Sequence, residues 1–128
     1  MTGDTHRLLP VLLDMSGRQA VVLGGGVQSA RAVRDLLASG ARVTVIAGGP
    51  DEREIAAQAT EGLTFETRGY VRGDLLGASV AACFFEDEEL CNAVVAEASA
   101  VGCMVYVAGA PSLSSFTMVG LAPDKGES

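Results

Sequence analysis

The sequence predicts an α/β protein in which one open parallel β-sheet carries helices on both faces. Short apolar runs rich in β-branched residues, the length of buried strands, alternate with stretches whose apolar residues recur at helical spacing. Residues 19–47 place a strand, a helix and a second strand within about thirty residues, which implies parallel pairing through a right-handed crossover.

The composition is that of a globular protein. The chain has 128 residues, of which 48% are hydrophobic and 20% charged, so we expect a single domain over residues 1–128 with flexible tails at 1–7 and 122–128. Sixteen acidic against nine basic residues give a formal charge of −7, which argues against a nucleic-acid partner. No apolar run approaches the ~18 residues of a membrane helix, and no signal-peptide core follows the N-terminus. We therefore expect a cytoplasmic protein with no membrane partner.

The cysteines indicate thiols and not a disulfide framework. There are three, spread along the chain and odd in number, which favours reduced and mostly buried side chains. His6 is the only histidine and no C-x-x-C is present, so no metal site is expected.

Each element has a local reason. Pro10 restricts the first apolar segment to an edge strand or an extended arm, and Gly40 and Gly102 end helices. The near-continuous apolar run at 78–85 is typical of a fully buried strand. The expected elements, in order, are an arm or strand at 8–13, a turn at 14–17, a strand at 19–23, a helix at 28–39, a strand at 42–47, a helix at 51–60, a strand at 63–67, one helical turn at 74–76, a strand at 78–85, a helix with a face at Leu90, Val94, Ala98 and Val101, a buried strand at 104–108, a turn at 109–112 and an extended segment at 115–121.

The most informative stretch is the glycine turn of Gly24, Gly25 and Gly26 between the first strand and the first helix. Gly24 permits a sharp turn, and Gly26 has no Cβ, so a pyrophosphate can lie against its backbone. A helix starting near Val27 points unpaired N–H groups and a partial positive charge at that place. The fit to G-x-G-x-x-G/A is imperfect because Ser29 holds the third position. The stretch predicts a dinucleotide site, and the alternative is a structural turn that is merely rich in glycine.

Ligands of such sheets bind beyond the carboxyl ends of the strands. This rule places the loops 24–28, 48–49, 85–87 and 109–111 around one crevice. Where dinucleotide folds usually carry an acid for the ribose, at the end of the second strand, this chain has Ile46 and Ala47, and the first acid is Asp51. Gly48 and Gly49 can admit an adenosine by close backbone approach and leave NAD or NADP open. We expect Asp87 to cap the next helix, and the alternative is a functional acid in the run 86–89.

Together these loops resemble the N-terminal domain of siroheme synthase, the precorrin-2 dehydrogenase and sirohydrochlorin ferrochelatase family. The resemblance covers about residues 8–121 and is carried by 9–11, 13–18, 22–26, Arg31, 36–45, 86–92, 105–111 and 115–118. It implies NAD-linked oxidation of precorrin-2 to sirohydrochlorin, in some members followed by iron insertion. It also implies that NAD binds at Val27 and Gln28 and at Gly48 and Gly49.

The chain departs from this family at the position held responsible for the chemistry. The last buried strand of the family ends in an aspartate, and Gly109 stands there in this sequence. A positioned general acid or base is worth roughly 10²–10⁴ in rate. The catalytic residue is therefore left unassigned, with Asp87 as a substitute candidate. The family's further helical region, which forms its dimer and covers the tetrapyrrole, has no counterpart in this sequence, which leaves a homodimer or a partner chain open.

Two main interpretations follow from the sequence. One is an NAD-dependent precorrin-2 dehydrogenase, and the alternative is a catalytically degenerate module that binds a dinucleotide or a tetrapyrrole. A purely structural or partner-binding domain is a third.

Overall fold

The computed structural model describes residues 7–48 and 61–119 of the chain. They contain one five-stranded sheet in which every neighbouring pair is parallel, in the order β3-β2-β1-β4-β5. The elements are β1 (Gln19–Leu23), α1 (Val27–Ala38), β2 (Arg42–Ile46), β3 (Leu63–Glu66), β4 (Val80–Cys83), α3 (Glu88–Val101), β5 (Met104–Val107) and the 3₁₀ turn η1 (Pro111–Leu113). This order confirms the predicted doubly wound, Rossmann-like sheet in a single domain.

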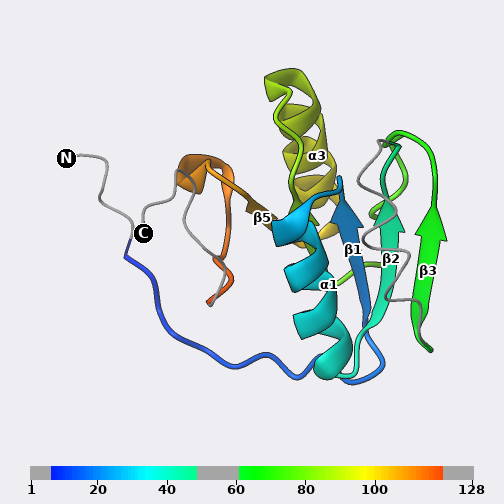
Figure 1. Ribbon diagram of the computed structural model, residues 1–128. Coiled ribbons are helices and arrows are strands. Elements are labelled where there is room, and N and C mark those ends of the chain that lie inside the picture. Colours follow the sequence, from blue (N-terminus) through cyan, green and yellow to red (C-terminus); the bar gives the residue numbers. More distant parts are fainter. Residues whose placement is uncertain (1–6, 49–60, 120–128) are drawn as a thin grey trace.

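The two long helices cover opposite faces of the sheet (Figure 1). Val33 of α1 belongs to the same core cluster as Val22, whereas Val94 of α3 belongs to the cluster that contains Leu23. Successive residues of β1 therefore point into different cores, and Val22 and Leu23 are both completely buried. Burial on both faces explains why the central strands are continuous apolar runs in the sequence.

β1 lies at the point where the strand order reverses. It pairs with β2 on one side and with β4 on the other. The loops after β1 and β4 leave the same end of the sheet and lead to α1 and α3 on its opposite faces. In open parallel sheets this switch point is where a crevice forms for a ligand. The topology thus places the glycine turn at that crevice.

The N-terminal segment adopts the second of its two predicted forms. Residues 8–13 make no strand and follow an extended path outside the sheet, with Leu12 fully exposed (Figure 1). The following turn is present, since Arg18 N–H donates to the Met15 carbonyl over 3.0 Å.

Several later elements differ from the prediction. The strand expected at 78–85 is limited to Val80–Cys83, although the N–H groups of the flanking Ser79 and Phe84 still donate to carbonyls of β1 over 2.8 Å. The strand expected to be buried at 104–108 is β5, which lies at the sheet edge and has half-buried Met104 and Tyr106 beside buried Val105 and Val107. The helical turn expected at 74–76 is a run of hydrogen-bonded turns. The segment expected at 115–121 forms no strand up to residue 119.

The buried face of α3 is rotated relative to the prediction. Leu90 is only half-buried and Val101 is exposed, while Cys91 and Glu97 are buried beside the predicted Val94 and Ala98. The reason is a loop that supplies three donors to one carboxylate. Glu97 accepts hydrogen bonds from the hydroxyl of Tyr70 (2.5 Å) and from the N–H groups of residues 73 (3.0 Å) and 75 (3.1 Å). A buried carboxylate satisfied in this way is compatible with a core position.

The same loop is fixed by a second polar cluster. Arg68 donates two hydrogen bonds of 3.0 Å to the carboxylate of Asp74 and one of 2.8 Å to Glu66. Burial raises the pKa of Asp74, but the Arg68 guanidinium and the Val71 N–H outweigh it and lower the pKa below its usual value. The loop between β3 and β4 is therefore rigidly tied to α3 and to the end of β3.

Some predictions fall on other parts of the chain. The helix expected at 51–60 and the tails expected at 1–7 and 122–128, except for exposed Arg7, lie outside the described residues. Within the described ranges, neither helix has the length and hydropathy needed to cross a membrane.

Candidate functional site

The glycine turn between β1 and α1 is built from two glycines with different tasks. Gly24 has φ 98° and donates its N–H to the Ile46 carbonyl over 2.9 Å. A Cβ on Gly24 would lie 3.3 Å from the carbonyl carbon of Phe84, so the turn packs directly on the end of β4. Gly26 has φ 108°, and a Cβ added there would meet no protein atom within 4 Å. The Gly26 backbone is thus open to a ligand, whereas Gly24 is needed for packing.

The Ser29 side chain hydrogen-bonds to the backbone of the glycine turn. Its hydroxyl donates a 2.7 Å hydrogen bond to the Gly24 carbonyl, and the residue is completely buried. The hydroxyl that departs from the usual motif therefore satisfies the turn's own backbone and is not available to a ligand.

The helix that follows begins without a side-chain cap. Gly26 is the N-cap residue of α1 and has no side chain to accept a hydrogen bond, and the first intrahelical bond runs from Ala30 N–H to the Gly26 carbonyl over 3.0 Å. The N–H groups of the first turn have no intrahelical acceptor. Their partial positive charge suits an anion such as a phosphate.

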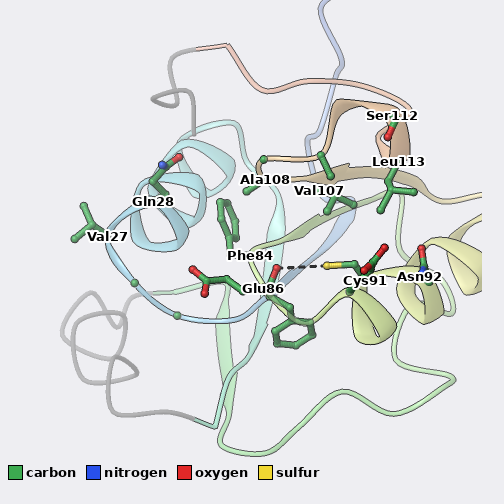
Figure 2. Close-up of a pocket in the computed structure, with 16 residues that line it drawn as sticks. Val27, Gln28, Phe84, Glu86, Cys91, Asn92, Val107, Ala108, Ser112 and Leu113 are labelled. Atoms are coloured by element: carbon green, nitrogen blue, oxygen red, sulfur yellow. Dashed lines mark hydrogen bonds between the residues drawn. The ribbon is translucent and has the colours of Figure 1, made fainter. Parts of the chain in front are cut away.

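A pocket of about 710 Å³ opens beside this turn, at the carboxyl ends of β1, β4 and β5 (Figure 2). It brings together three of the four predicted loops, through residues 25–28, 84–86 and 107–110. Gly48 does not line it: a Cβ on Gly48 would lie 3.5 Å from the backbone of Arg68. Gly49 lies outside the described residues.

The structure gives Asp87 its predicted capping role. Its carboxylate accepts the N–H groups of Glu89 (2.8 Å) and Leu90 (3.1 Å) at the start of α3. Asp87 does not line the pocket, whereas its neighbours Glu86 and Glu88 do.

The pocket also contains residues that sequence reasoning missed. These are Cys91 and Asn92, near the N-terminus of α3. Glu86 and Glu88 also line the pocket, and both fall within the run 86–89, where the sequence left a functional acid as the alternative. The signal for Glu86 and Glu88 was present: both flank the cap of a helix that starts directly after a central strand.

The thiols are not activated. Cys91 donates from Sγ to the Phe85 carbonyl over 3.4 Å, and burial raises the pKa of its thiol. Burial also raises the pKa of Cys83 to about 12 and of Cys103 to about 11. All three cysteines are free and buried, as predicted, and such protonated thiols are poor nucleophiles.

At the end of β5 the pocket wall has no acidic side chain. Gly109 has φ 76° and lies in a turn closed by Ala110 N–H donating to the Val107 carbonyl over 3.1 Å. Among the described residues that line the pocket, the charged side chains are Glu86 and Glu88. In the ranges 7–48 and 61–119, no three His, Cys, Asp or Glu residues are grouped as metal ligands.

A glycine turn at the switch point of a parallel sheet, beside an uncapped helix, defines a Rossmann-like domain. The chain belongs to the protein family described as "Putative NAD(P)-binding", whose family model matches residues 11–120.

More particular matches follow. The siroheme synthase of Ectopseudomonas mendocina (strain ymp) is 35% identical over 109 residues, and that of Stutzerimonas stutzeri (strain A1501) is 35% identical over 108 residues. The aligned parts are 85% and 84% of this chain, which spans 23% of the length of each relative. The solved structure of SirC, a precorrin-2 dehydrogenase, matches with a TM-score of 0.55 and 25% identity over 79% of this chain and 48% of that one. These matches confirm the family resemblance found in the motifs.

Proposed function

We propose that the chain binds NAD in the pocket beside the glycine turn and acts as an NAD-dependent precorrin-2 dehydrogenase domain. The observation that carries the proposal is the combination of Gly26, open to solvent at φ 108°, with the uncapped N-terminus of α1. Together they form a cradle of backbone donors without a Cβ in the way, which is what a diphosphate requires.

The contacts proposed for the cofactor use mainly the backbone. Gly25 and Gly26, with Val27 and Gln28, line the pocket and would hold the diphosphate. Gly24, whose N–H and carbonyl are bonded to Ile46 and Ser29, would contribute by shaping the turn. Gly48 and Gly49 would receive the adenosine end after β2. NAD is preferred to NADP on the resemblance to the siroheme synthases and the precorrin-2 dehydrogenase alone.

The chemistry proposed is a two-electron oxidation. Precorrin-2 loses a hydride, which NAD accepts when bound, and a proton, which passes to a base or to water. The chain's own part is to orient the two reactants between the glycine turn and the ends of β4 and β5. The three free thiols agree with a reducing compartment such as the cytoplasm, where we place this activity.

The test is direct. The protein is titrated with NAD in a calorimeter and then mixed with NAD and precorrin-2 while NADH absorbance is followed. We expect saturable binding and NADH formation above the uncatalysed oxidation. Failure to bind NAD or ADP-ribose would remove the proposal.

The geometry at Gly109 favours a second candidate, a module that binds NAD or a tetrapyrrole without turning it over. No side chain projects from Gly109, and the neighbouring candidate Asp87 is engaged as a cap. On this reading the wild-type protein binds NAD but forms no NADH, and Gly109→Asp gains turnover. The substitution is sterically reasonable because aspartate tolerates the left-handed backbone at φ 76° better than most residues. If the wild type already forms NADH and Gly109→Asp forms it at the same rate, the result would instead favour the enzyme.

A further inference from the structure

The walls of the pocket have opposite electrostatic sign. One wall is the glycine turn with the N-terminus of α1, where backbone N–H groups carry a partial positive charge. The other is formed by Glu86 and Glu88, the pocket's charged lining residues. Figure 2 shows Glu86 lying between the glycine turn, marked by Val27, and Cys91 of α3.

Both carboxylates are attached to fixed backbone. Glu86 follows Phe85, whose carbonyl accepts a hydrogen bond from the Cys91 thiol over 3.4 Å. Glu88 is the first residue of α3, and Asp87 holds that end through two hydrogen bonds of 2.8 and 3.1 Å. The negative wall is thus a constant feature of the site.

We propose that Glu86 and Glu88 make this site select the oxidised over the reduced nicotinamide dinucleotide. The inference rests on the proposed function. NAD⁺ joins two phosphate charges to a positively charged nicotinamide ring, so its ends match a site with one positive and one negative wall. Hydride addition removes the ring charge and leaves the phosphates unchanged. NADH therefore carries one more unit of net negative charge into the same pocket and loses its attraction to the carboxylates.

The effect is moderate because both carboxylates are exposed to water. Charges separated by several ångströms in a water-like dielectric, with a Debye length of about 8 Å at physiological salt, give a preference for NAD⁺ of roughly threefold to tenfold. The same repulsion accelerates release of the reduced product. High salt should reduce the preference, since screening weakens both the attraction of the carboxylates for the NAD⁺ ring and their repulsion of NADH.

Matched substitutions test this. Glu86→Gln and Glu88→Gln each remove one negative charge from the pocket. Glu89→Gln removes the same charge from the same first turn of α3, but Glu89 does not line the pocket. Thermal unfolding of each variant checks that α3 is intact, because Glu88→Gln and Glu89→Gln lose the same favourable interaction with the helix dipole.

Calorimetry then gives the dissociation constants of NAD⁺, NADH and ADP-ribose for each protein. We expect the wild type and Glu89→Gln to bind NAD⁺ at least threefold more tightly than NADH, and the two pocket variants to show a clearly smaller ratio. Equal affinities for NAD⁺ and NADH in the wild type would overturn this inference and leave the proposed function intact. If Glu86→Gln and Glu88→Gln both keep the wild-type ratio of NAD⁺ to NADH affinity, the inference is likewise overturned and the proposed function stands. If neither the two dinucleotides nor ADP-ribose bind, the proposed function fails, and this inference fails with it.

Discussion

Replacing Gly26 by alanine tests the central claim about the site. Gly26 has φ 108° and ψ 177°, a backbone region confined essentially to glycine. An alanine there costs roughly 1–3 kcal/mol of folding free energy through backbone strain. Its Cβ meets no protein atom within 4 Å, so the methyl group projects into the space that we assign to the diphosphate.

Gly73→Ala provides the matched control. Gly73 has φ 107°, its added Cβ also meets nothing within 4 Å, and it does not line the pocket. Its N–H donates to Glu97, and alanine retains that donor. Both variants should therefore lose comparable stability, while only one of them carries a methyl group at the proposed binding site.

The assay combines denaturant unfolding with calorimetric titration of NAD. We expect Gly26→Ala to weaken NAD binding at least tenfold, equivalent to about 1.4 kcal/mol, and Gly73→Ala to leave it within twofold of the wild type. Two results would refute the reasoning: undiminished affinity in Gly26→Ala, or the same loss of affinity in both variants. The second would mean that strain, and not an obstructed cradle, had weakened the binding.

Three further predictions concern the supports of the site. Ser29→Ala should lower the free energy of unfolding, measured by urea titration, by about 1–3 kcal/mol, because it leaves a buried carbonyl of the glycine turn unsatisfied. Ser39→Ala is the control: it removes an exposed hydrogen bond to a helix carbonyl and should cost much less. A double-mutant cycle of Tyr70→Phe and Glu97→Gln should show a coupling energy of about 0.5–3 kcal/mol, since the two side chains share one 2.5 Å hydrogen bond, and additive effects would contradict that pairing. The pKa of Asp74 is lower in the folded protein than its value of 3.8 in the unfolded chain, so the ionised carboxylate stabilises the fold above pH 3.8. This contribution is lost as the pH falls from 3.8 through the folded pKa. Asp74→Asn should therefore flatten the acid side of the curve of unfolding free energy against pH.

Local sequence patterns are enough to predict the order of the described elements and the position of the glycine turn. β-branched apolar runs, helical spacing and the stop at Gly40 act over a few residues, so they can be read without knowing which parts of the chain meet. The Asp87 cap was predictable for the same reason, since a cap is satisfied by N–H groups within the next three residues.

Which side chains face the pocket depends on contacts between distant parts of the chain. Asp87 turned toward its helix while Glu86 and Glu88 turned to the crevice, and Gly48 packed beside Arg68. Glu97 became buried because a loop some twenty residues earlier in the chain supplied its donors, a contact that no local pattern records. The direction of a side chain depends on packing between segments distant in sequence, and the charge pattern of the site follows from that packing.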